Sequence, residues 1–151
     1  MTQTTPAGPK YAVGFAFDSR GHVALIRKNR PSFLAGLWNG IGGHIELNED
    51  PLAAMVREFH EETGVLTRPD QWTHLNPYLS YDAFKLGILA IFVAHTDDVR
   101  AIRTTTDEEV RLWSASDALQ LGLAPDCEFL LRAILSLEGQ LNPKESPHAA
   151  C

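Results

Sequence analysis

The segment Gly43–Val65 constrains the fold of this 151-residue chain more than any other. It contains Glu58, Glu61 and Glu62 at spacings i, i+3 and i+4, so a helix places all three carboxylates on one face. Like charges at these spacings destabilise an isolated helix by about 0.2–0.5 kcal/mol per pair. A hard divalent cation such as Mg²⁺ or Mn²⁺ prefers oxygen ligands and converts this repulsion into a binding site. We therefore expect a helix that carries a metal site.

The sequence also indicates where this helix begins and ends. Asn48 or Asp50 suits the N-cap, and Pro51 suits the first turn. Gly64 suits the position just after the last turn. The side opposite the carboxylates carries a stripe formed by Leu52, Val56, Phe59 and Thr63. We expect this stripe to be buried; the alternative is an ordinary exposed helix with an acidic outer face, against which the preceding glycines and Glu49 argue.

The segment resembles the signature of the Nudix hydrolase family, G-x5-E-x7-R-E-U-x-E-E-x-G-U, in which U is a bulky apolar residue. Its nine specified positions are filled by Gly43, Glu49, Arg57, Glu58, Phe59, Glu61, Glu62, Gly64 and Val65. Phe59 departs mildly, because the family more often has an aliphatic residue there. The resemblance implies a single α/β domain, an α/β/α sandwich with a mixed β-sheet. It also implies hydrolysis of a diphosphate linked to another moiety, usually a nucleoside, with Mg²⁺ or Mn²⁺.

The same resemblance implies which residues bind the metal. The motif residues that it assigns to the metal site are Gly43, Glu58, Glu61 and Glu62. Gly43 would also give the preceding loop a tight turn. In relatives, a further acidic residue from a loop before a late strand often completes the site. Glu108 or Glu109 occupies such a place, and the sequence does not choose between them.

Two other motif residues are implied to support the chemistry. Arg57 would hold Glu49 by an ion pair, and Glu49 would lie near the metal or its water. A metal-bound water has a lowered pKa, and the cation screens phosphate charge from the attacking oxygen. The carboxylate that removes the proton from this water stays open between Glu49, Glu58 and the acidic run 107–109.

The residues before and after the motif offer clues to the substrate. Asn39 and Trp113 resemble the branch of the family that removes oxidised purine nucleoside triphosphates, in which an amide reads the base edge and an aromatic ring stacks on the base. The plainer interpretation is a turn residue and a packed aromatic ring. Tyr81 instead resembles a base-stacking tyrosine of relatives that cleave dinucleoside polyphosphates. Arg27 and Arg30, together with Lys28, would contact phosphates or are simply exposed charges.

Composition limits the remaining classes. The net charge of −6 argues against binding a nucleic-acid polymer, which normally requires a basic surface. Two cysteines are too few for a disulfide framework, and no apolar run approaches the length of a membrane span. We expect a cytoplasmic protein with a flexible segment at 1–9, one domain at 10–138 and a tail at 139–151. Homodimers are common among the family that the chain resembles.

Patterns outside the motif predict the rest of the sandwich. Strands are expected at 11–17, 22–27, 71–79, 85–94 and 110–114, a polar loop at 97–107, and a helix at 125–137. Ser116 is expected to cap a short helical turn. The inner side of the last helix is predicted to consist of Phe129, Leu130, Ala133, Ile134 and Leu137. The chain is thus expected to be a Mg²⁺-dependent hydrolase of a nucleoside di- or triphosphate derivative or of a dinucleoside polyphosphate; the alternative is a nucleotide-sensing module without catalysis.

Overall fold

The structure is a computed structural model that describes residues 8–81 and 87–139. Its strands are β1 (Tyr11–Phe17), β2 (His22–Arg27), β3 (Trp38–Asn39), β4 (Ile41–His44), β5 (Trp72–Tyr81), β6 (Gly87–His95) and β7 (Val110–Ser114). Its helices are α1 (Pro51–Thr63), α2 (Ala115–Ala118) and α3 (Pro125–Leu137), with 3₁₀ turns η1 (Ser32–Leu34), η2 (Pro69–Gln71) and η4 (Asp97–Ala101). The predicted N-terminal segment and C-terminal tail lie largely outside the described residues.

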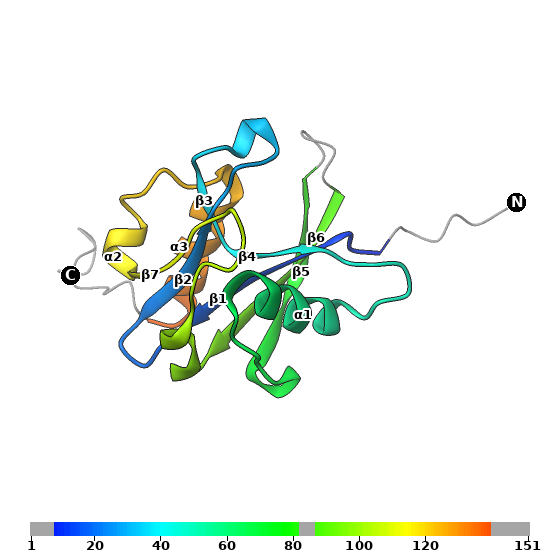
Figure 1. Ribbon diagram of the computed structural model, residues 1–151, viewed down its shortest axis with the longest axis horizontal. Coiled ribbons are helices and arrows are strands. Elements are labelled where there is room, and N and C mark those ends of the chain that lie inside the picture. The colour runs from blue at the N-terminus through cyan, green and yellow to red at the C-terminus, as the bar shows by residue number, and fades with distance from the viewer. Residues whose placement is uncertain (1–7, 82–86, 140–151) are drawn as a thin grey trace, which may run out of the picture.

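All the strands join in one mixed sheet (Figure 1). The order along its main path is β3-β2-β1-β6-β5, with β4 paired to β1 and β7 paired to β2. β1 runs parallel to β6 along its whole length and is antiparallel to its other partners. Its second edge is shared, because β4 pairs with its first half and β2 with its end, at Phe17↔Val23. The strands β2 and β4 therefore pair with different parts of the same edge of β1.

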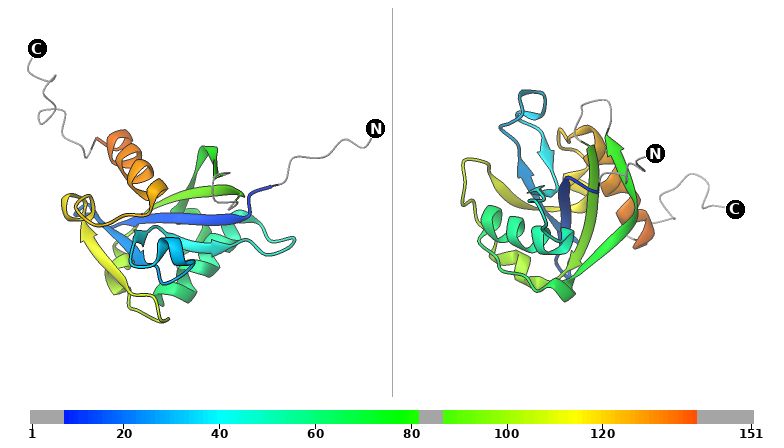
Figure 2. Two further views of the ribbon diagram at one scale, coloured as in Figure 1. Left: turned by 90° about the horizontal axis from the view of Figure 1, so that it is seen from above. Right: turned by 90° about the vertical axis from the view of Figure 1, so that its right-hand side faces the viewer.

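Helices cover both faces of this sheet, α1 on one and α3 on the other (Figure 2). Phe15 and Phe17 of β1 pack in the core cluster that α3 covers. Ala12 and Ala16, whose side chains point the opposite way, pack in the cluster beneath α1. The predicted α/β/α sandwich with a mixed sheet is thus confirmed.

Helix α1 begins and ends as the sequence predicts. The carboxylate of Asp50, rather than Asn48, is the N-cap and accepts from the main-chain N–H groups of Leu52 and Ala53, an interaction worth about 1 kcal/mol. Gly64 ends the helix at φ 76°, a left-handed conformation that glycine adopts without strain. The buried face differs from the predicted stripe: it consists of Ala54, Met55, Phe59 and Thr63. Leu52 and Val56 are only half-buried at its border.

Helix α3 has the predicted bounds, and its predicted inner face is right for Leu130 and Ile134 but wrong for Phe129 and Leu137. Phe129 and Leu137 are 65% and 79% exposed. The buried side consists of Cys127, Leu130, Leu131, Ile134 and Leu135. Apolar residues surround most of α3, so docking against the sheet, rather than periodicity alone, decides which of them are covered. Ahead of α3, Ser114 rather than Ser116 caps α2, by accepting from the N–H of Asp117.

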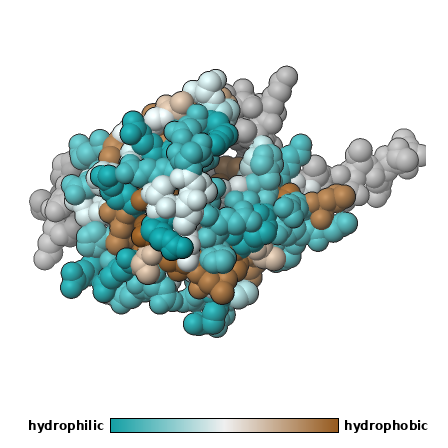
Figure 3. Space-filling model, viewed as in Figure 1, coloured by the Kyte–Doolittle hydropathy of each residue, from teal (hydrophilic) through white to brown (hydrophobic). Residues whose placement is uncertain are grey.

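The face of the molecule that carries the outer side of α1 is mainly polar. Hydrophilic side chains cover most of the face in Figure 3, where the outer side of α1 lies. The loop predicted at 97–107 begins with the 3₁₀ turn η4. Among the described residues, no helix combines the length and hydrophobicity that crossing a membrane requires.

Candidate active site

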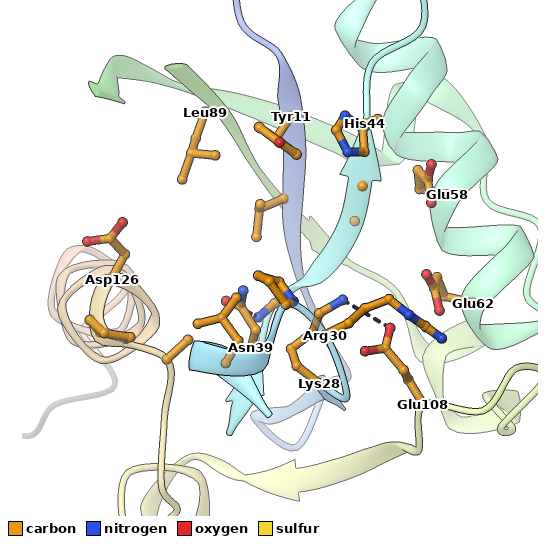
Figure 4. A pocket seen from close by; sticks show the side chains of 18 of the residues that line it. Tyr11, Lys28, Arg30, Asn39, His44, Glu58, Glu62, Leu89, Glu108 and Asp126 are labelled. Carbon is orange, nitrogen blue, oxygen red and sulfur yellow. Dashed lines mark hydrogen bonds and ion pairs between the residues drawn. The ribbon is translucent and has the colours of Figure 1, made fainter. Parts of the chain in front are cut away.

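A cavity of about 800 Å³ lies between α1 and the beginning of α3 (Figure 4). Its walls come from β1, β3, β4, β6, the two helices, the connection after β2 and the loop before β7. A volume of this size is typical of pockets for small molecules. The charged lining residues are Lys28, Arg30, Glu58, Glu62, Glu108 and Asp126. The cavity is therefore the place where the acidic face of α1 meets residues from distant parts of the chain.

Arg57 connects α1 to the loop that precedes it. Its Nε and Nη2 atoms each donate to one carboxylate oxygen of Glu49, both at 2.8 Å. Its Nη1 donates to Glu58 at 2.8 Å, and its Nη2 also donates to the carbonyl oxygen of His44 at 3.0 Å. The paired hydrogen bonds from Arg57 lower the pKa of Glu49 to about 2. Glu49 is therefore a fixed carboxylate at neutral pH.

Gly43 provides the space that Glu58 occupies. A Cβ atom on Gly43 would lie 2.6 Å from the carboxyl carbon of Glu58, closer than non-bonded atoms allow. Gly43 itself lies within β4, so the predicted tight turn at this residue is wrong. The left-handed residue of the following loop is Asn48, at φ 63°. Glycine is needed at position 43 because the acidic helix approaches the strand so closely.

Glu58 and Glu62 both project from α1 into the cavity, whereas Glu61 does not (Figure 4). Burial raises the pKa of Glu58, and the nearby Arg57 offsets this only in part. Burial likewise raises the pKa of Glu62; Lys28 opposes the shift, and the charges of Glu108 and Glu58 add to it. The Glu61 side chain is 56% exposed and lies 3.3 Å from Arg57. The helix face thus presents two incompletely neutralised carboxylates to the cavity.

The loop before β7 supplies a third acid. Glu108 is buried and accepts from Lys28 Nζ at 3.0 Å and from the main-chain N–H of Asn29 at 2.6 Å. Glu109 is not among the lining residues and instead pairs with Arg111 at 2.8 Å. The structure therefore brings Glu108, and not Glu109, to the cavity, a choice that the sequence left open.

The arrangement of these acids bears on the predicted metal site. Across residues 8–81 and 87–139, no three acidic or histidine side chains form a ready-made metal-binding group. Glu58, Glu61 and Glu62 thus do not converge as a set, because the Arg57 guanidinium contacts both Glu58 and Glu61. The donor chemistry still fits Mg²⁺ or Mn²⁺. Glu58 and Glu62 offer partly desolvated carboxylate oxygens, and burial raises the pKa of both groups.

The end of the cavity away from these acids is less charged. Asn39 lies on its wall, and its Oδ1 accepts from the Gly40 N–H at 2.9 Å, which leaves its amide N–H groups as donors. Asp126, in the first turn of α3, faces the same space, and burial raises the pKa of its carboxyl group. Tyr11 and Leu89 line another wall, where the Tyr11 ring lies beside that of His44, with centroids 4.4 Å apart (Figure 4). Sequence analysis missed Asp126, Tyr11 and Leu89, since only the fold brings them to the same cavity as Asn39.

Two predicted substrate residues, Trp113 and Arg27, are placed differently. Trp113 is not among the residues that line the cavity; its ring packs edge-on against Trp38, with centroids 5.3 Å apart. Arg27 ends β2 as an exposed residue outside the cavity, whereas the next residue, Lys28, lines it. Arg30 lines the cavity as predicted. Tyr81 ends β5, and its side chain lies outside the described part of the chain.

Comparisons with known proteins agree with this geometry. A family model described as "NUDIX domain" matches residues 9–134. A CTP pyrophosphohydrolase of Escherichia coli is 29% identical over 127 residues, which cover 83% of this chain and 90% of the relative. An 8-oxo-dGTP diphosphatase of Proteus vulgaris is 35% identical over 54 residues, 36% of this chain and 48% of the relative. The solved NUDIX domain of Shewanella oneidensis NrtR in complex with ADP ribose superposes with a TM-score of 0.74 at 21% identity, covering 89% of this chain and 90% of that one.

Proposed function

The chain belongs to the NUDIX domain family, whose enzymes act on pyrophosphate bonds, and we propose that it is a divalent-metal-dependent pyrophosphohydrolase of a nucleoside triphosphate. One observation carries the proposal: a single cavity of about 800 Å³ joins the carboxylates of α1 to a part of its wall that carries Asn39 and Asp126. Relatives named for CTP and 8-oxo-dGTP support a triphosphate substrate.

The excess of negative charge in the cavity supports the proposal that the substrate binds together with a metal ion. Among the described lining residues, four carboxylates face two permanent cations, Lys28 and Arg30. A polyphosphate anion would therefore enter a space that is already negative, and repulsion would oppose binding. A divalent cation held by Glu58 and Glu62, with Glu108 across the cavity, would offset this excess of negative charge and supply a local positive charge for the phosphates. Mg²⁺ is the ion that we propose, with Mn²⁺ as its substitute.

The residues around the cation would then have separate roles in catalysis. The cation, when bound, supplies a water of lowered pKa and screens the phosphate charge. Arg57 holds Glu58 against β4 and keeps Glu49 ionised. Because both oxygens of Glu49 accept from Arg57 and its pKa is about 2, Glu49 is a weak proton acceptor. Glu58, whose pKa is raised by burial, is therefore favoured over Glu49 as the general base.

The opposite end of the cavity is proposed to read the base. The free amide N–H groups of Asn39 donate to acceptors on the base edge, and Asp126 accepts from an amino or ring N–H group. Tyr11 and Leu89 would contact the faces of the base. Lys28 and Arg30 would contact the phosphates between the two ends.

A hydrolysis panel tests this proposal. The panel contains CTP, dCTP, GTP, 8-oxo-dGTP, dATP and diadenosine tetraphosphate, each with Mg²⁺, and product identity is the readout. We expect a nucleoside monophosphate and pyrophosphate from at least one triphosphate, and no product after chelation of the metal. Cleavage of diadenosine tetraphosphate alone would favour the dinucleoside alternative. Binding by calorimetry without any release would favour a nucleotide sensor and reject the enzymatic proposal.

A further inference from the structure

Arg30 and Asp107 form an ion pair beside the cavity, between the connection after β2 and the loop before β7. The Arg30 Nη2 atom donates to both oxygens of Asp107, at 2.8 and 2.6 Å. The two side chains are 60% and 65% exposed. Arg30 lines the cavity, whereas Asp107 is not among the lining residues. The carboxylate therefore holds one of the cations of the cavity from outside it.

The neighbouring pair, Lys28 with Glu108, lies deeper. These side chains are 19% and 6% exposed, and Glu108 has a second donor in the main-chain N–H of Asn29. Lys28 is thus the deeper cation and Arg30 the shallower one, so a phosphate chain that extends from the buried part of the cavity toward solvent would meet Lys28 before Arg30. The two cations differ in depth and in how firmly they are already paired.

The loop before β7 does not depend on Arg30 for its position. Asn29 Nδ2 donates to the main-chain carbonyl oxygen of Asp107 at 2.6 Å. Thr106 Oγ1 accepts from the N–H of Glu108 at 3.1 Å and also contacts Glu62. Opening the ion pair therefore leaves the loop, and Glu108 with it, in place.

We propose that Arg30 exchanges the Asp107 carboxylate for the outer phosphate of the substrate, and so selects for the length of the phosphate chain. The inference rests on the proposed function and assigns Asp107 as a specificity-determining residue that competes for Arg30. A guanidinium fork fits phosphate oxygens as well as carboxylate oxygens. Exposed ion pairs contribute little in water, so the exchange costs little. A chain of two phosphates held at the deeper Lys28 would extend less far toward the exposed Arg30 than a chain of three.

The test uses inorganic tripolyphosphate and pyrophosphate as ligands, in isothermal titration calorimetry at fixed free Mg²⁺. Asp107→Asn retains the shape of the side chain but frees Arg30, so tripolyphosphate should bind about two- to fivefold more tightly. Arg30→Gln should weaken tripolyphosphate about tenfold, because a charge-assisted hydrogen bond is lost. Pyrophosphate affinity should change less than about twofold in both variants. In the double variant, Asp107→Asn should have no further effect, since no guanidinium remains to be freed.

Asp70→Asn is the matched control. It removes another exposed Arg–Asp pair, Arg68 with Asp70 at 3.0 Å, whose residues do not line the cavity. The inference is overturned if Asp107→Asn behaves as wild type or as Asp70→Asn, if both anions respond equally, or if wild type does not bind tripolyphosphate. None of these outcomes depends on turnover. A protein that hydrolyses nucleotides yet fails this test retains the proposed function without the exchange.

Discussion

Two buried acidic regions of this molecule have opposite electrostatics. Asp18, at the β1–β2 turn, is 5% exposed and accepts from the main-chain N–H groups of Arg20 and His22 and from Arg100 Nε. Burial acts to raise its pKa, but these hydrogen bonds outweigh burial, and the pKa is lowered. Burial also acts on Glu58 and Glu62, and there the surroundings leave the pKa values raised.

The difference separates structural from functional acids. The donors around Asp18 satisfy the ionised carboxylate, so folding itself is stabilised by its charge. The carboxylates of the cavity are held near one another with too few donors, an arrangement that costs stability unless a cation binds. We infer that the chain tolerates this cost at the cavity because its function requires the cation.

The largest expected effect comes from removing one acid of each region. Glu62→Gln should lower kcat/KM by on the order of 10²–10³-fold with the fold intact, because a metal ligand is lost. Asp18→Asn should leave kcat/KM within about twofold of wild type, since the β1–β2 turn does not line the cavity. Steady-state kinetics on the substrate found by the panel, with circular dichroism as a check of folding, measures both. Equal losses of kcat/KM in the two variants would contradict the distinction between functional and structural acids.

A second variant sharpens the comparison within the site. Arg57→Lys removes the fork that binds Glu49 and the contact with the His44 carbonyl. We expect kcat to fall roughly tenfold to a hundredfold, because Glu58 and Glu49 lose their fixed positions. Arg132→Lys, which loosens an exposed pair with Glu128 on α3, is the matched control and should have no effect. A kcat unchanged in Arg57→Lys would show that the hydrogen bonds of the Arg57 guanidinium are not needed for catalysis.

The free energy of unfolding should depend on Asp18 more than on the acids of the cavity. Asp18→Ala removes the acceptor of two main-chain N–H groups and of Arg100 Nε, while Arg100 Nη2 keeps Ser19 and Asp97. We expect the free energy of unfolding in urea to fall by about 2 kcal/mol. Under metal-free conditions, Glu62→Gln should instead raise it slightly, by less than about 1 kcal/mol, because a desolvated charge is removed. A destabilised Glu62→Gln protein would contradict the idea that this acid opposes folding.

The smallest effect is the dependence of stability on pH. The pKa of Asp18 is lower in the folded than in the unfolded chain, so its contribution is fully present above the unfolded pKa of about 3.9. That contribution is lost as the pH falls through the folded value. The difference in stability between wild type and Asp18→Asn should therefore be constant from pH 5 to 7, and shrink below about pH 4. Urea titrations at several pH values measure it; a difference that grows on acidification would contradict the assigned direction.

The sequence predicted α1 better than it predicted α3. In α1, Asp50, Pro51 and Gly64 define the ends by local chemistry, and the helix begins and ends as expected. In α3, Pro125 marks the start, but the apolar residues do not form a single stripe. The exposure of Phe129 and Leu137 therefore reflects how the helix docks, which local patterns do not contain.

Some residues of the candidate site could likewise be predicted from the sequence, whereas others could not. The motif placed Glu58 and Glu62 on one helix face, because helical spacing alone determines it. It did not identify Glu108 over Glu109, since the direction of a loop side chain depends on Lys28 and Asn29 far away in sequence. Trp113 points into the core beneath α3 rather than into the cavity, a consequence of strand register. Asp126 gave no signal before the fold brought it opposite Asn39.

The most direct test of the account is a Mn²⁺ titration of the metal-free protein, followed by electron paramagnetic resonance without any nucleotide. If Glu58 and Glu62 form the cation site, wild type and Asp18→Asn should bind Mn²⁺ with equal affinity. Glu58→Gln and Glu62→Gln should each bind at least about tenfold more weakly. Unchanged Mn²⁺ affinity in both glutamine variants would contradict the central claim that these two acids hold the ion.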